Sequence, residues 1–485
     1  MEDIVAVLGY LRHLDVGQDD VPPRTARARS PRPNEPLSMV ISAAAKSHAR
    51  SVAPAQQAIM QNDPCQIVSF RFAPLLFLGH IVRVLWVGHN LAYPPVRGVL
   101  QRNYNLLREA AKQSEVYVLA FDQPATRPLG VSAEDCAEAL RKFCAHVEWT
   151  PIASGISKNS YFLGLRGLFS RNAYDLNWLA SSAMAARLKQ TLNRVKFDVI
   201  HFDTLGLAPY RALASGVGTV LNHHNIESSM MEHRAALEKR RIPRQYWRWE
   251  ANKLRRAERD YCPRFSANLV VSPEDGETLQ KFAPGIETRV VANGVDTEYF
   301  TPRPDPNGNT LLFCGGLDWY PNGEAMAYFF DQIWPRLTRE RPDLRVLVVG
   351  RRPPKWLMEL GDSDRRVHVT GFVDDVRPYF REATAYICPI RVGGGTRLKI
   401  LDALAMGMPL IGTTFACSGI SVQDEKHVLM GDTAEVFVNQ VLRVLAGPAL
   451  RASLAAQGRQ LVCQNYSWPV IGKSLFLAYR EAASV

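Results

Sequence analysis

The sequence has no apolar run long enough to cross a membrane as a helix. Such a helix needs about 20 consecutive apolar residues. The nearest candidate, FAPLLFLGHIVRVLWVG at 72–88, is interrupted by His80 and Arg83. The same stretch does not have the form of a signal peptide. The sequence therefore predicts neither a membrane span nor a secretion signal at this place.

The sequence also lacks the patterns that cysteine forms in metal sites and disulfide frameworks. There is no CxxC and no Cys/His spacing typical of zinc. The eight cysteines are scattered, at positions 65, 136, 144, 262, 314, 388, 417 and 463. This distribution favours free thiols in a reducing compartment, so we expect a cytoplasmic protein. Neither a Ser/His/Asp nor a paired-carboxylate arrangement indicates a double-displacement enzyme.

Length and composition indicate a globular protein of more than one domain. A chain of 485 residues exceeds one ordinary hydrophobic core, and its composition is 47% hydrophobic and 22% charged. Residues 1–80 differ from the rest, because the stretch DVPPRTARARSPRPNEP has no apolar period. We interpret 1–80 as an N-terminal extension that is disordered or weakly helical; a mis-assigned translation start is the alternative.

The net charge of +11 points to an acidic partner without naming it. Much of the excess lies in residues 233–265, where Arg and Lys alternate with Tyr and Trp, and with acids at near-helical spacing. A solvated helix face is the simplest interpretation. Peripheral contact with an acceptor or with the inner face of a membrane is the alternative, and nucleic acid is disfavoured.

Short β-branched runs followed by helical patterns predict two α/β domains with parallel sheets. The N-terminal domain is expected over 81–292, and a linker rich in Gly, Pro and Asn follows at 290–309. The C-terminal domain is expected over 293–465, and residues 466–485 form a helix that crosses back to the first domain. Predicted strands lie at 81–88, 115–121, 197–203, 218–228, 267–272, 310–317, 344–351, 367–373, 385–390 and 409–413. Predicted helices include 132–146, about 160–195, 322–341 with a kink at Pro335, 376–383 and 396–407.

Residues 393–413, GGGTRLKILDALAMGMPLIGT, predict a phosphate-binding turn. The glycines 393–395 follow a strand and precede a helix expected to begin near Thr396, so free N–H groups would face an anion. Arg397 and Lys399 add positive charge. Asp402, about one turn further on, has the carboxylate that a ribose needs. In doubly wound sheets ligands bind at the carboxyl ends of the strands, here in the cleft between two facing domains.

Six ordered motifs over residues 81–485 resemble family-4 retaining glycosyltransferases of the GT-B fold, most closely those of exopolysaccharide synthesis. The motifs are PP..G in the first loop, HNIES (224–228), ANGVDTEYF (292–300), FCGGLDWYPNGEA (313–325), VTGFVDDVRPYF (369–380) and GGGTRLKILDALAMGMPLIGT (393–413). The resemblance implies transfer of a sugar from a nucleotide-diphosphate-sugar to a glycan or lipid-linked acceptor, in bacterial polysaccharide biosynthesis. It implies neither a metal nor a cofactor, because the nucleotide sugar is a substrate.

The resemblance also implies a role for each matching residue. Arg397 and Lys399 would bind the donor diphosphate as catalytic groups, and His224 would face the transferred sugar. Asp402 would hold the ribose. The remaining donor-binding positions are backbone or base contacts: Gly98, Gly315, Gly316, Phe372, Val373, Gly393, Gly394, Gly395 and Thr396.

The sequence departs from the family pattern at three of these positions. Gly394 stands where the family has a sugar-binding glutamate, and Asp402 replaces a second glutamate. Gly316 stands near the place of the usual arginine, which shifts the diphosphate load onto Arg397 and Lys399. Two alternatives stay open: a non-catalytic scaffold or partner subunit, which the lost acid at Gly394 suggests, and a nucleotide-sugar 2-epimerase on the same two-domain architecture. Asp374 and Asp375 resemble a metal-binding DxD only superficially and suit helix capping better.

Overall fold

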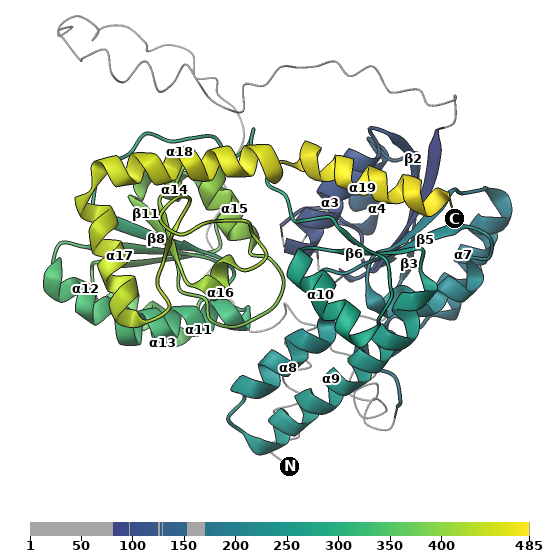
Figure 1. The fold of residues 1–485 in the computed structure, drawn as a ribbon, viewed down its shortest axis with the longest axis horizontal. Helices are drawn as coiled ribbons and strands as arrows, with labels where there is room; N and C mark the ends of the chain where they lie inside the picture. Colours follow the sequence, from purple (N-terminus) through teal and green to yellow (C-terminus); the bar gives the residue numbers. More distant parts are fainter. Residues whose placement is uncertain (1–80, 97, 125–126, 129, 153–169, 485) are drawn as a thin grey trace, which may run out of the picture.

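The computed structural model describes residues 81–96, 98–124, 127–128, 130–152 and 170–484. Within these residues the chain forms two α/β domains, each built on one parallel sheet with helices around it (Figure 1). The predicted pair of doubly wound domains is confirmed. The predicted extension 1–80, and the part of the predicted helical region that falls within 153–169, lie outside the described residues.

The first sheet has seven parallel strands in the order β3-β2-β1-β4-β5-β6-β7. They are β1 (Val82–Gly88), β2 (Ser114–Asp122), β3 (His146–Pro151), β4 (Val199–Phe202), β5 (Gly218–Asn222), β6 (Ala267–Val270) and β7 (Thr288–Val290). The order reverses between β1 and β4, so their carboxyl ends meet at the point where such sheets bind ligands. The sequence did not predict β3 or β7, because β3 is partly exposed and β7 has only three residues.

Helices pack on both faces of this sheet, which explains why its central strand β1 carries apolar side chains on both faces. Leu85 and Val87 of β1 pack in the apolar cluster on one face, and Val84 and Trp86 pack in the cluster on the other. The helical elements are α3 (Gly98–Ala110), α4 (Ala133–Arg141), α6 (Tyr174–Trp178), α7 (Ser182–Arg194), the 3-10 helix η2 (Leu205–Leu213), α8 (Glu227–Leu237), α9 (Arg241–Tyr261), the 3-10 helix η3 (Cys262–Arg264) and α10 (Pro273–Phe282).

The second sheet has six parallel strands in the order β10-β9-β8-β11-β12-β13. They are β8 (Thr310–Cys314), β9 (Arg345–Val349), β10 (Val367–Gly371), β11 (Ala385–Cys388), β12 (Leu410–Gly412) and β13 (Leu429–Met430). The helices are α11 (Tyr320–Tyr328), the π-helical η4 (Phe329–Ile333), α12 (Trp334–Glu340), α13 (Lys355–Ser363), α14 (Arg377–Glu382), α15 (Leu398–Ala405), α16 (Thr414–Cys417), α17 (Ala434–Ala446) and α18 (Pro448–Asn465). At the predicted kink, η4 ends just before α12, and Pro335 lies in the first turn of α12, where its missing N–H is tolerated.

The chain passes between the domains twice, and the two crossings are hydrogen-bonded to each other. The Val295 N–H donates to the Tyr466 carbonyl at 2.8 Å, and the Trp468 N–H donates to the Val295 carbonyl at 3.3 Å. After the second crossing α19 (Trp468–Ala483) packs against α3 and β5 of the first domain (Figure 1). Six of its residues complete the apolar cluster there: Trp468, Ile471, Leu475, Ala478, Tyr479 and Ala482.

The sequence predicted no membrane span and free cysteine thiols. In the described part of the chain no helix combines the length and the apolar character that crossing a membrane requires. Six of the cysteines within the described ranges are free thiols: Cys136, Cys144, Cys262, Cys314, Cys388 and Cys417.

Gly218 tests how tightly α19 is packed on the first domain. A Cβ at this position would overlap the backbone carbonyl of Ala482 in α19. We expect Gly218→Ala to lower the free energy of unfolding by about 1–3 kcal/mol, because strand and helix backbone cannot move aside as a side chain can. Thermal unfolding followed by circular dichroism measures the loss.

Gly323→Ala in α11 is the matched control, since its new Cβ would meet only the Leu317 carbonyl, at 3.5 Å. We expect this variant to unfold at the wild-type temperature or slightly above it. Equal unfolding temperatures for both variants would contradict tight packing of α19.

Candidate functional site

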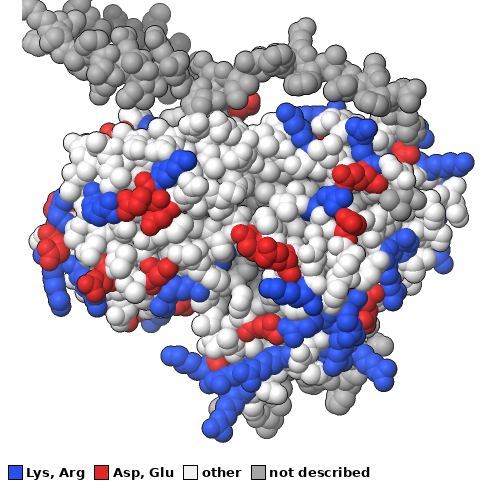
Figure 2. Space-filling view, viewed as in Figure 1, with Lys and Arg blue, Asp and Glu red and all other residues white. Residues whose placement is uncertain are grey.

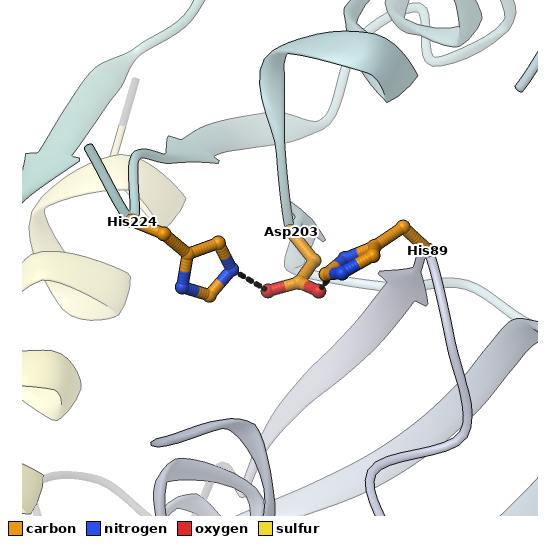
Figure 3. A group of neighbouring side chains, drawn as sticks. All are labelled: His89, Asp203 and His224. Carbon is orange, nitrogen blue, oxygen red and sulfur yellow. Dashed lines mark hydrogen bonds and ion pairs between the residues drawn. The ribbon is translucent and has the colours of Figure 1, made fainter. Parts of the chain in front are cut away.

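A buried carboxylate, Asp203, lies at the centre of the first domain's ligand-binding edge. His89 follows β1, Asp203 follows β4, and His224 lies two residues beyond β5, so the three side chains converge from neighbouring strands (Figure 3). His89 Nδ1 is 2.5 Å from one carboxylate oxygen, and His224 Nε2 is 3.1 Å from the other. The amides of Asn103 and Asn222 donate to the same two oxygens, at 2.7 and 3.3 Å.

Charge decides which nitrogens of the two histidines carry protons. Burial alone would raise the pKa of Asp203, but His89 and His224 outweigh burial and hold this pKa well below its usual range. The ionised carboxylate can only accept, so His89 Nδ1 and His224 Nε2 both donate. Asn90 donates to His89 Nε2 at 2.9 Å, so both ring nitrogens of His89 have a hydrogen-bond partner.

His224 is left with one unused ring nitrogen. Burial lowers the pKa of His224, although Asp203 opposes this, so the ring is neutral near pH 7. With the proton on Nε2, the Nδ1 atom keeps a lone pair. Nδ1 is buried and has no hydrogen-bond partner among the described residues. It is therefore an acceptor available to a ligand hydroxyl.

The same three side chains are close enough to hold a metal ion, which sequence spacing did not reveal. Their donor atoms lie within 4.8 Å of one another. The other histidine of the pair, His223, is turned toward Asn268 at 3.2 Å, and burial lowers its pKa to about 4. Both oxygens of Asp203 already accept from N–H donors, including two amides that a metal would displace. This donor set favours a hydrogen-bonded network over a metal centre.

A second buried charge, Arg102, links this network to the other domain. Arg102 donates to the side chain of Asn222 at 3.2 Å and to the carbonyl of Ala292 at 2.8 Å. It also donates to the side chain of Asn293 at 3.1 Å, and Asn293 in turn donates to the hydroxyl of Thr396. Polar contacts thus run from Asp203 in the first domain to Thr396 in the second.

The glycine turn of the second domain rests directly on the first domain. Gly393 and Gly395 have φ of +121° and +64°, conformations that side chains rarely adopt. A Cβ at Gly395 would overlap the side chain of Asn225, and one at Gly394 would lie 3.4 Å from both Asn225 and Met230. Close approach of the two domains therefore requires glycine at position 395, whereas a Cβ at position 394 would only reach van der Waals contact, so nothing in this packing explains the missing acid there.

The helix after this turn starts later than predicted. α15 begins at Leu398, not near Thr396, and Arg397 is its cap residue. Two features explain this: the left-handed Gly395 delays the helix, and the Thr396 hydroxyl is held by Asn293, a residue distant in the sequence. Gly98, at the start of α3, faces this helix, because a Cβ there would lie 3.3 Å from the Leu398 side chain. Gly98 and the glycine turn thus belong to one interdomain contact.

Arg397 is buried beside the glycine turn and keeps one free nitrogen. Only 9% of the residue is exposed. Its Nη1 donates to the Gly395 carbonyl at 2.6 Å and to Ser418 Oγ at 3.1 Å, and its guanidinium carbon lies 4.6 Å from the centre of the Phe415 ring. Its Nη2 is buried without a partner among the described residues. Burial lowers the pKa of Arg397, but an arginine keeps its charge near pH 7.

Lys399 faces the other glycine turn, after β8. Its ammonium donates to Asn322 Oδ1 at 2.5 Å and fills the space that a side chain at Gly315 would need. Burial lowers the pKa of Lys399. One turn further along α15, burial raises the pKa of Asp402 to about 7 against the opposing charge of Lys399. Asp402 Oδ1 is buried with no partner in the described part of the chain.

Arg351 lies beside Gly316, the position where the family's usual arginine is missing. A Cβ at Gly316 would lie 3.2 Å from Arg351 Nε, and Arg351 pairs with Asp318 at 3.1 Å. Arg351 is not among the predicted site residues, although the predicted strand 344–351 ends on it. The available signal was the strand order, because β9 lies next to β8 and brings its carboxyl end to the Gly315–Gly316 turn.

The two predicted base contacts lie at the end of β10, on the same edge of the sheet. Phe372 is 65% exposed, whereas Val373 packs against the core of the second domain. The predicted capping role also fits Asp375, which accepts from the N–H of Arg377 at 2.9 Å as α14 begins.

Two family models match the chain, one for each domain. The model described as Glycosyltransferase Family 4 matches residues 96–299, and the model described as Glycosyl transferases group 1 matches residues 308–447. Among curated proteins, the chain is 26% identical over 235 residues to a phosphatidyl-myo-inositol mannosyltransferase of Mycolicibacterium smegmatis, covering 46% of this chain and 60% of that protein.

A second curated relative is the GDP-mannose-dependent monoacylated alpha-(1-6)-phosphatidylinositol monomannoside mannosyltransferase of Corynebacterium glutamicum. The chain is 26% identical to it over 203 residues, covering 38% of this chain and 53% of that protein. The chain thus spans about half to three fifths of the length of these two relatives.

Solved structures of low sequence identity share the two-domain architecture. The sucrose-phosphate synthase of Thermosynechococcus elongatus aligns with a TM-score of 0.61 at 16% identity, covering 82% of this chain and 98% of that one. The Anabaena protein HepE in complex with UDP aligns with a TM-score of 0.58 at 14% identity, covering 82% and 99%. These likenesses show a GT-B fold.

Asp203→Asn tests the assigned protonation of the histidines. Each carboxylate oxygen accepts from two of the four donors, so in the amide two donors would face its NH2 group. We expect the free energy of unfolding to fall by about 2–4 kcal/mol, and His224 to populate both tautomers. Urea unfolding and nitrogen NMR of the histidine rings measure the two effects.

Asp260→Asn, which alters an exposed pair with Arg259, is the control and should change neither the stability nor the tautomer of His224. If His224 in the Asp203→Asn protein were still protonated only on Nε2, the assignment would be contradicted.

Asp402 predicts a pH dependence of stability. An unfolded aspartate titrates near pH 4, whereas the folded pKa is about 7, so the folded state holds its proton to higher pH. The stabilisation is complete below about pH 4 and is lost as the pH rises to 7, by at most about 4 kcal/mol. Asp402→Asn has no such proton, so its stability should fall less between pH 5 and pH 8. Urea unfolding at pH 5 and pH 8 measures the free energy of unfolding of both proteins. An equal change with pH in wild type and in Asp402→Asn would disprove the prediction.

Proposed function

The chain belongs to the group 1, family 4 glycosyltransferases and has a GT-B fold, and from this premise we propose its reaction. It transfers a sugar from a nucleotide-diphosphate-sugar to a glycan or lipid-linked acceptor, with retention at the anomeric carbon. Two curated relatives are named as mannosyltransferases of phosphatidylinositol lipids, which supports a lipid-linked acceptor. We place the reaction in bacterial polysaccharide or glycolipid biosynthesis, in the cytoplasm, with no metal or cofactor.

Three of the buried polar atoms that have no partner among the described residues carry this proposal. They are His224 Nδ1, Arg397 Nη2 and Asp402 Oδ1. An unsatisfied buried polar atom costs about 1–3 kcal/mol, so folded proteins keep few of them unless a ligand supplies the missing partner. The His224 atom is an acceptor and matches a sugar hydroxyl. The Arg397 atom is a cationic donor and matches a phosphate oxygen, and the carboxylate atom of Asp402 matches a ribose hydroxyl.

The donor would lie along the carboxyl edge of the second sheet. Arg397 and Lys399 hold the diphosphate from two sides, since the first faces α16 and the second faces the turn after β8. Arg351 adds a third cation beside Gly316. Asp402 accepts from the ribose, and the backbone around Phe372 meets the base.

The chemistry would rest on charge stabilisation. As the bond between the anomeric carbon and the diphosphate breaks, the cations stabilise the charge that develops on the leaving phosphate. The leaving phosphate takes the proton of the acceptor hydroxyl on the same face, so the new bond keeps the configuration of the old one. His224 orients the sugar by accepting from one of its hydroxyls. Closure of the two domains excludes water that would hydrolyse the donor.

A panel of nucleotide sugars tests the reaction class. Purified protein is mixed with UDP- and GDP-sugars, with and without lipid-linked acceptors. Thermal unfolding measures donor binding, nucleoside diphosphate release measures turnover, and NMR of the product gives the anomer. We expect one donor to raise the unfolding temperature and to react only with acceptor. A changed sugar without acceptor would instead identify an epimerase, and the absence of any nucleotide effect would exclude both enzymes.

Arg397→Ala and Lys399→Ala separate an enzyme from a scaffold, the alternative that Gly394 suggests. Each variant removes one positive charge next to the leaving diphosphate, so we expect kcat to fall by about 100- to 1000-fold. Lys355→Ala, which removes a cation that is 90% exposed in α13, is the matched control and should keep full turnover. Unchanged nucleotide binding and turnover in both site variants would contradict the donor site.

A further inference from the structure

The paired helices α8 and α9 project from the first domain, and their tip carries exposed aliphatic side chains. The two helices pack against each other and end in a short loop (Figure 1). Leu237 before the loop is 43% exposed, and Ile242 after it is 52% exposed. Lys239 and Arg241 lie beside them, exposed, with no ion pair or side-chain hydrogen bond to another described residue.

Positive charge continues from this tip along one face of α9. Arg241, Arg248, Asn252, Arg255 and Arg259 recur at intervals of three, four or seven residues, which places them on one side of the helix. Figure 2 shows Lys and Arg gathered over this part of the molecule. The segment 227–261 contains ten Lys or Arg and six Asp or Glu.

The far end of this cationic face opens into a pocket between α9 and α10. The pocket has a volume of about 310 Å³, and its lining contains four cations and no acidic side chain: Asn252, Arg255, Arg256, Arg259, Lys281 and Phe282. Arg256 and Lys281 are exposed and make no ion pair or side-chain hydrogen bond within the described residues. Arg255 pairs with Glu232 and Arg259 with Asp260, but the Nε atom of Arg255 is buried without a partner among the described residues.

We propose that this face, from Leu237 and Ile242 to the α9–α10 pocket, docks on an anionic lipid bilayer. The aliphatic tip enters the interfacial region, the cations of α9 lie against the charged headgroups, and the pocket receives one phosphate headgroup. A solvated helix face would explain the charge alone, but not the aliphatic pair at its tip. Nucleic-acid binding fits less well, because contacts to phosphates and bases would leave the exposed aliphatic pair at the tip without a role.

The same helices also touch the candidate donor turn. In α8, Met230 lies against Gly394, and His233 Nδ1 is 3.3 Å from the Gly393 carbonyl. Docking would therefore hold the interdomain site close to the bilayer. If the proposed function holds, this is where a lipid-linked acceptor meets the donor; the docking itself does not depend on glycosyl transfer.

Vesicle flotation of the full chain tests the docking surface. The vesicles are phosphatidylcholine alone, or phosphatidylcholine with about 30% phosphatidylglycerol. We expect binding only to the anionic vesicles. Arg256→Glu with Lys281→Glu should weaken it at least about 25-fold, since each cation at such a surface contributes about fivefold. Lys142→Glu with Arg336→Glu changes the net charge equally at exposed cations outside the surface, and should bind like wild type.

Three outcomes would overturn the proposal. They are no binding to anionic vesicles, an equal loss in both charge-reversal pairs, and tighter binding to a DNA duplex than to the vesicles at the same salt concentration. Leu237→Ser with Ile242→Ser should leave weaker binding that added salt abolishes, because only electrostatic attraction remains. Unchanged binding would show that the tip does not belong to the docking surface. The flotation assay contains no nucleotide sugar, so its result does not depend on turnover. A protein that binds these vesicles but shows no transfer in the nucleotide-sugar panel would refute the proposed function and leave the docking intact.

Discussion

One ionised carboxylate, held by four N–H donors inside the protein, governs the geometry of the candidate site. A buried charge is stable only when its hydrogen-bonding capacity is met, and Asp203 meets it with His89, His224 and two asparagine amides. These donors arrive from the ends of β1 and β5 and from α3, so the order of the strands determines the site. Through Arg102 the same constraint extends to the linker between the domains.

Much of the fold and part of the site could be predicted because both depend on local patterns. Buried parallel strands appear as short apolar runs, and a ligand edge lies where those runs end. That reasoning placed the glycines 393–395 and His224 at strand ends of separate domains. In the structure the two segments touch, because a Cβ added at Gly395 would lie 3.0 Å from the carbonyl oxygen of His224. The roles assigned to these residues remain predictions.

Contacts between residues distant in sequence could not be predicted from one chain. His89, Asp203 and His224 are separated by more than a hundred and by about twenty positions, and no spacing rule connects them. Arg351 reaches Gly316 from a neighbouring strand, which only the sheet order reveals. The late start of α15 has a similar origin, because Thr396 is held by Asn293 across the domain boundary. Tertiary contacts outweighed the local helix signal there.

The return of α19 to the first domain affects how the protein is made. The apolar cluster that α19 completes includes strand residues such as Val84 and Trp86, which the ribosome delivers almost four hundred residues earlier. Until α19 emerges, the part of that face that α3 and α4 do not cover stays exposed, so the nascent chain presents apolar surface throughout synthesis of the second domain. A chaperone that shields this face during translation would be expected to raise the yield of native protein.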